Sequence, residues 1–167
     1  MYVKVTAMEE KDADPVPVQR IEVQDPFAAH GRYDYTDAFA VDLPGPDASP
    51  PATWLGSALS RVPAIVAWVA ARLGFPPGTG DPLDGWEIRT STPEMVHLVV
   101  ELPLMHVDLI GRNAAPARRT LTTLLTYRRP LLARLVWVVV GPAHRRTVRW
   151  VLATGLRPEP TDLRPPE

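Results

Sequence analysis

The stretch Arg119-Thr-Leu-Thr-Thr-Leu-Leu-Thr-Tyr127, followed by Arg128-Arg-Pro130 and an apolar segment that runs to about Ala153, decides the fold. Its first part is rich in leucine and threonine and ends before a proline, which is typical of a β-strand. The apolar segment predicts a long C-terminal helix. A helix that follows the last strand so closely has to lie back across the sheet. We therefore expect any ligand to bind between the helix and the sheet.

More strands are predicted upstream of this stretch. Residues 86–90, 95–102 and 105–110 alternate between apolar and polar side chains, and short turn sequences separate them. Together with the strand at 119–127 they predict an antiparallel meander. An earlier strand is predicted at 33–43, where apolar side chains alternate with Ala40 and Asp42 before a Pro-Gly-Pro turn.

Two short helices are predicted between the strand at 33–43 and the meander. Asp47-Ala-Ser49 offers capping side chains before Pro50-Pro51, which suit the first turn of a helix. Apolar residues at helical spacing then lie on both sides of Pro63. Because an interior proline costs a helix about 3 kcal/mol, two helices fit better than one. The whole order predicts an α+β fold.

The composition is that of a one-domain globular protein. The 167 residues suffice to bury one core. We expect a flexible N-terminal arm at 1–18, a single domain at 19–155 and a disordered proline-rich tail at 156–167. The chain has no cysteine, which excludes disulfides and thiolate metal sites. There is no apolar signal segment and no apolar run of about 20 residues, so we expect a cytoplasmic protein.

Charge is unevenly distributed along the chain. Residues 1–60 contain 10 acidic and 4 basic side chains, whereas residues 111–157 contain 10 arginines and no acidic side chain. This asymmetry is compatible with an anionic ligand, an acidic partner or ion pairs between the two halves of the fold. The third interpretation is favoured, because such pairing is available within the chain.

The chain resembles the START-like/polyketide-cyclase (SRPBCC) superfamily, and within it a family of small bacterial domains. The resemblance covers about residues 33–155. It rests on Asp37-Ala-Phe39, Gly85-Trp86, Leu121-Thr-Thr-Leu-Leu-Thr-Tyr127 and Trp137 with Gly141-Pro-Ala-His-Arg145. It implies a helix-grip fold, in which an antiparallel β-sheet wraps around the long C-terminal helix. One strand fewer than usual precedes the two short helices, unless Arg20-Ile-Glu-Val23 completes the hairpin.

Three polar side chains are candidates for catalysis: His144, Tyr127 and Asp37. His144 shares a helical stripe with apolar residues and follows Gly141-Pro142, which should bend the helix and free a carbonyl. It could act as an acid or base, or simply hydrogen-bond the freed carbonyl, and the second interpretation is favoured. Tyr127 could instead be a core residue, and Asp37 could cap a turn or pair with an arginine.

The candidate ligand-binding residues are those expected to line the space beneath the C-terminal helix. They are Trp54, Trp86, Thr123, Leu125, Trp137 and Val140. The three tryptophans would suit a flat ligand, although large core residues are the commoner role. Thr123 would add a hydroxyl to an otherwise apolar pocket. A further group, His97, His106, Asp108 and Glu101, lacks the spacing of a metal motif, and exposed strand positions explain it.

These observations lead to one functional hypothesis and one rival. The chain is expected to bind a hydrophobic or aromatic small molecule, and it may be a cofactor-independent cyclase, dehydratase or isomerase of the kind that the resemblance implies. The rival is a non-catalytic carrier of lipid-like ligands or an interaction module with a filled core. No metal or cofactor is expected. Nucleic acid and a membrane surface are the less favoured partners, and a homodimer stays open.

Overall fold

The computed structural model describes residues 17–76, 80, 81 and 83–154. The order of elements begins with β1 (Val18–Ile21), α1 (Pro26–His30), β2 (Tyr35–Asp42), α2 (Pro51–Leu59) and α3 (Ala64–Arg72). It continues with β3 (Glu87–Ser91), β4 (Met95–Glu101), β5 (Met105–Ala115), β6 (Arg118–Tyr127) and α4 (Pro130–Thr154). The predicted tail lies outside the described residues. Of the predicted arm, Val18 already belongs to β1.

The strands form one antiparallel sheet in the order β1-β2-β6-β5-β4-β3. The predicted α+β class, the four-strand meander, the two helices before it and the long C-terminal helix are all confirmed. β2 pairs with β6, so the strand that precedes the helices and the last strand lie side by side in the sheet. β1 pairs with β2 and supplies the additional strand that the sequence had left open.

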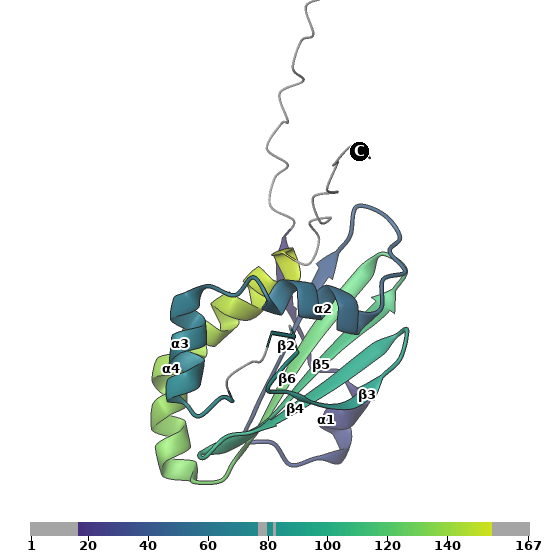
Figure 1. Ribbon diagram of the computed structural model, residues 1–167. Coiled ribbons are helices and arrows are strands. Elements are labelled where there is room, and N and C mark those ends of the chain that lie inside the picture. The colour runs from purple at the N-terminus through teal and green to yellow at the C-terminus, as the bar shows by residue number, and fades with distance from the viewer. Residues whose placement is uncertain (1–16, 77–79, 82, 155–167) are drawn as a thin grey trace, which may run out of the picture.

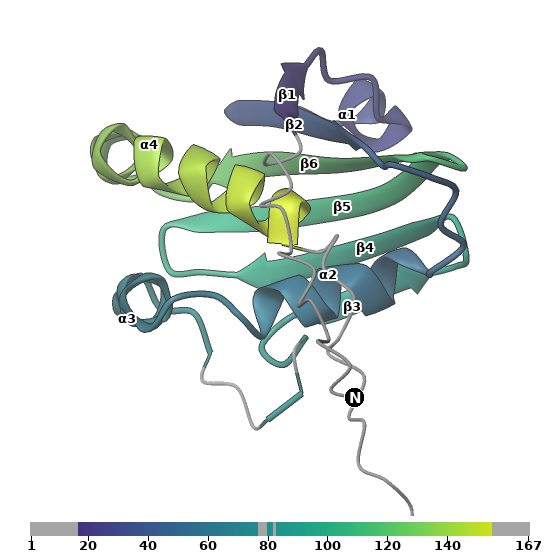
Figure 2. The ribbon, with the colours of Figure 1, turned by 90° about the horizontal axis from the view of Figure 1, so that it is seen from above.

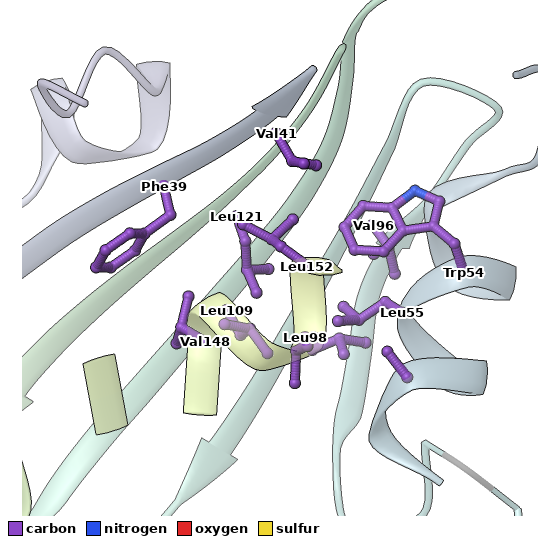
Figure 3. Packing of buried hydrophobic residues seen from close by; sticks show 12 residues of the cluster. Phe39, Val41, Trp54, Leu55, Val96, Leu98, Leu109, Leu121, Val148 and Leu152 are labelled. Carbon is purple, nitrogen blue, oxygen red and sulfur yellow. The ribbon is translucent and has the colours of Figure 1, made fainter. Parts of the chain in front are cut away.

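One face of the sheet is covered by α2 and the C-terminal half of α4 (Figure 2). Because side chains alternate along a strand, Phe39, Leu121, Leu109 and Leu98 all point to this face. Figure 3 shows them meeting Leu55 from α2 and two residues of α4. This first core cluster has twelve buried residues: Phe39, Val41, Trp54, Leu55, Ala58, Val96, Leu98, Leu109, Leu121, Val148, Val151 and Leu152.

The helix α4 changes direction between its two halves (Figures 1 and 2). Pro142 lies within it and has no N–H to donate to the carbonyl of Val138, which is an ordinary cause of a bend. The C-terminal half buries Val148, Val151 and Leu152 on the first cluster. The N-terminal half buries only Ala133, which joins a second core cluster with Val100, Leu102, Met105 and Leu125.

Ion pairs join the acidic N-terminal half of the chain to the arginines of β5 and β6. The guanidinium of Arg112 bonds the carboxylate of Asp25 at 2.6 Å, and Arg118 bonds Asp42 at 3.1 Å. The buried side chain of Arg119 pairs with Asp47. These contacts confirm the interpretation that the charge asymmetry serves pairing within the fold.

Candidate functional site

A polar row crosses the sheet between the two core clusters. Asp37 of β2 lies directly opposite Thr123 of β6, and both side chains are buried. On one side of this row lie Phe39 and Leu121 of the first cluster. On the other side lie Leu125 of the second cluster and Tyr35, which packs against it. A buried carboxylate between two apolar clusters is costly and therefore unusual for a purely structural position.

Helix α4 covers the polar row with side chains from the region around its bend. The ring centroids of Trp137 and His144 are 5.0 Å apart, and that of Trp137 lies 4.8 Å from the ring of Tyr35. Gly141 lies between these two α4 residues in the helix. A Cβ at Gly141 would lie 3.3 Å from Nε1 of Trp137, so the glycine leaves room for the indole.

The carboxylate of Asp37 is held by groups from the sheet and from α4. The hydroxyl of Tyr35 donates a hydrogen bond of 2.6 Å to Oδ2, and Nε2 of His144 lies 3.6 Å from the same oxygen. Burial alone would raise the pKa of Asp37. The imidazole of His144 and the nearby hydroxyls of Tyr35 and Thr123 outweigh burial and hold this pKa below its ordinary value of 3.8. The carboxylate is therefore charged at neutral pH.

The pKa of Tyr35 shifts in the opposite direction. Burial raises it most, and the hydrogen bond to Asp37 raises it further, while Arg145 opposes both effects. Tyr35 thus stays a neutral hydrogen-bond donor to the carboxylate. The sequence gave no reason to single out Tyr35, although it has the same strand parity as Asp37.

Four polar atoms at this row are buried without a hydrogen-bond partner among the described residues. They are Oδ1 of Asp37, Oγ1 of Thr123, Nε1 of Trp137 and Nε2 of His144. A buried polar atom that lacks a partner costs about 1–3 kcal/mol, and native proteins contain few of them. Four of them on residues of one small region indicate a place where a polar group from outside the chain completes the bonding.

The chemistry of these atoms defines the group that would fit. The carboxylate oxygen of Asp37 only accepts hydrogen bonds, the indole N–H of Trp137 only donates, and the threonine hydroxyl does both. A hydroxyl group can donate to Asp37 and accept from Trp137 at the same time. The Asp37–His144 pair also has the composition of a general-base pair, in which the carboxylate orients the imidazole and stabilises its charged form.

The other predicted site residues lie at varying distances along the fold. Val140 is half-buried one turn before His144, and Leu125 lies in the second cluster. Trp86 packs on both clusters, with its ring 5.1 Å from that of Phe75. Trp54 is a buried core residue whose indole N–H donates to Asn113 at 3.2 Å, away from the polar row.

Tyr127 lies on the same face of β6 as Thr123, half-buried beside the second cluster. Its pKa is raised by burial and by Asp34, and lowered in part by Arg134. The backbone N–H of Tyr127 donates to the carboxylate of Asp34 at 2.8 Å. Its electrostatic neighbours are therefore Asp34 and Arg134, whereas the structure brings Asp37 and His144 together at the polar row.

Two hollows are outlined by described residues, and neither is lined by the polar row. One of about 230 Å³ lies on the opposite face of the sheet, where its lining includes Ala38, Thr122, Asp25 and Arg112. The other, of about 320 Å³, lies beside residues 43–47. The space beneath α4 is therefore largely filled by side chains as the structure stands.

The group formed by His97, His106, Asp108 and Glu101 is a hydrogen-bonded network on the opposite face. Nε2 of His97 lies 2.7 Å from Asp108, and His106 bridges Asp108 and Glu101 at 3.1 and 2.6 Å. The expectation of exposed positions is wrong for His97 and Asp108, which are buried. The ring of Phe27 from α1 lies 4.7 Å from that of His97 and helps to cover it. Within the described part of the chain, no three His, Asp or Glu residues are arranged to hold a metal ion.

Comparisons of the chain with models of known protein families, with curated protein sequences and with solved structures found no match. The argument for a function therefore rests on the geometry of the polar row.

Proposed function

We propose that the chain binds a small apolar or aromatic molecule that carries a hydroxyl group, with this hydroxyl in the polar row beneath α4. The observation that carries the proposal is the set of four buried polar atoms without partners, on Asp37, Thr123, Trp137 and His144. Apolar side chains of both core clusters flank the row and suit the rest of such a molecule. In this proposal the fold is a helix-grip and α4 is the lid of the site.

The same residues support a catalytic version of the proposal. Asp37 and His144 would remove a proton from one position of the bound molecule and return it at another, and the apolar surroundings would exclude water. Cyclisation, dehydration or isomerisation of a polyketide-like compound would then proceed without a cofactor, as the resemblance to polyketide cyclases implies. Tyr35 would keep Asp37 charged and oriented through the hydrogen bond of 2.6 Å.

The rival function is an interaction module with a filled core. It is favoured by the two hollows, which both lie away from the polar row. In that case the unpartnered atoms would be satisfied by buried water rather than by a ligand.

Calorimetric titration with 2-naphthol distinguishes the two functions. This probe has a flat apolar body and one hydroxyl, and 2-methylnaphthalene is a matched control of the same shape without the hydroxyl. The proposed function predicts saturable binding of 2-naphthol that is clearly tighter than that of the control. Absence of binding, together with native mass spectrometry that detects no molecule co-purifying with the chain, would support the filled core.

Thr123→Val is expected to weaken binding of 2-naphthol without weakening the fold. Valine has nearly the shape of threonine but removes a buried hydroxyl that has no partner. The free energy of unfolding of the unliganded chain should stay the same or rise by about 1 kcal/mol. Urea unfolding measures this change, and Thr122→Val on the opposite face of β6 is the control. A loss of stability specific to Thr123→Val would show that its hydroxyl is structural.

A further inference from the structure

Two helices expose large apolar side chains at one end of the molecule. On α4 the exposed fractions are 79% for Leu131, 68% for Leu135 and 77% for Val139, and on α3 they are 66% for Ile65 and 56% for Trp68. Figures 1 and 2 place α3 and the N-terminal half of α4 at the same end. We call this surface the apolar tip; it consists of Ile65, Trp68, Leu131, Leu132, Leu135, Val138 and Val139.

The apolar tip is a consequence of how the two helices are placed. Leu131, Leu135 and Val138 recur at helical spacing and therefore lie on one side of α4. The bend in α4 directs this half away from the course of the C-terminal half, and its only buried residue is Ala133. Helix α3 has no buried residue although eight of its nine side chains are apolar. Apolar area gathered in this way marks a contact surface.

The charges around the apolar tip are all of one sign along both helices. Residues 109–158 contain ten arginines and residues 48–80 contain two, and neither range has an acidic side chain. Arg134 lies within the apolar stripe of α4, between Leu131 and Val138. The guanidinium of Arg72 lies 5.0 Å from the ring centroid of Trp68. An apolar surface with arginines at its border matches a lipid bilayer with anionic headgroups.

We propose that the apolar tip docks the chain on the surface of an anionic membrane. The apolar side chains would enter the boundary of the acyl region, and Arg134 and Arg72 would contact the phosphates. A second copy of the chain fits less well, because a symmetric contact would bring the arginines of both copies together. No described helix is by itself long and apolar enough to cross a bilayer, whereas α2 and α3 together reach that length and composition across a bend of 96°.

The test is co-sedimentation of the full chain with vesicles of equal parts phosphatidylcholine and phosphatidylglycerol, compared with vesicles of phosphatidylcholine alone. We expect binding to the anionic vesicles only. The variant Leu135→Ser/Val139→Ser should lower the affinity about tenfold or more. Ile88→Ser is the matched control, because Ile88 is 50% exposed on β3, outside the apolar tip. Arg134→Gln should lower the affinity about fivefold, and Arg20→Gln on β1 should not.

Two results would overturn membrane docking. One is absence of binding to the anionic vesicles, including the case in which sedimentation velocity shows a dimer that Leu135→Ser/Val139→Ser disrupts. The other is equal binding of this variant and of the parent chain. The substituted side chains are exposed, so thermal unfolding should be unchanged in both variants. The test uses other residues than the polar row, so its outcome is separate from that of 2-naphthol binding.

Discussion

Asp37→Asn is expected to lower the affinity of the chain for 2-naphthol by tenfold to a hundredfold. A hydrogen bond to a charged group contributes about 1.5–3 kcal/mol, and each factor of ten in affinity corresponds to about 1.4 kcal/mol. Asparagine keeps the shape of the side chain but removes the charge that would attract the hydroxyl. In the catalytic version, loss of the base should lower turnover by about 10²–10⁴-fold.

Asp34→Asn is the matched control for this substitution. Asp34 precedes the same strand, and its carboxylate accepts from the backbone N–H of Tyr127 rather than facing the polar row. Calorimetric titration of both variants measures the difference. Equal affinities of Asp37→Asn and Asp34→Asn for 2-naphthol would remove Asp37 from the proposed site.

The pKa of Asp37 provides a second measurement on the same variant. A carboxyl whose pKa is lower in the folded state stabilises the fold at pH values above its unfolded pKa. That stabilisation is lost as the pH falls through the folded pKa, below about 4. The free energy of unfolding of the parent chain should therefore fall more steeply in acid than that of Asp37→Asn. Urea unfolding at a series of pH values tests this expectation.

Phe39→Ala is expected to lower the free energy of unfolding by about 3–5 kcal/mol. Phe39 is fully buried in the first core cluster, where the C-terminal half of α4 packs on the sheet (Figure 3). The guanidinium of Arg149 lies 5.4 Å from its ring centroid, so the substitution also removes a contact with α4. A marginally stable domain would lose a large part of its total stability.

The control for Phe39→Ala is Phe27→Ala on α1. Phe27 is 37% exposed and contacts the ring of His97, so its removal leaves a smaller cavity and should cost clearly less. Both variants are compared by urea unfolding with the slope held common. A cost for Phe39→Ala no larger than that for Phe27→Ala would contradict the packing of α4 on this part of the sheet.

Much of the fold was predictable because each segment carries its own periodicity. Alternation along 33–43 and the spacing of apolar residues around Pro63 gave the strand and both helices within a few residues of their bounds. The parity of β6 also placed Thr123 and Leu125 on the inner face. The pairing of β2 with β6 depends on contacts between distant segments, and local patterns do not encode such contacts.

The polar row shows the same limit on the scale of a site. Asp37, Thr123 and His144 were each singled out, but only the register of β2 on β6 and the course of α4 bring them together. Tyr35 was missed because its role depends on the hydrogen bond to Asp37. The apolar tip was also beyond reach, because an apolar helical stripe is the same in sequence whether a sheet covers it or not.

The most direct test of the central claim is the ¹H–¹⁵N signal of the Trp137 indole, assigned with Trp137→Phe. The N–H of this indole is buried without a partner among the described residues, and the proposed hydroxyl would accept its hydrogen bond. Saturating 2-naphthol should move the indole proton downfield, whereas 2-methylnaphthalene should not. An indole signal that both compounds leave unchanged, or move equally, would contradict a hydroxyl-binding site beneath α4.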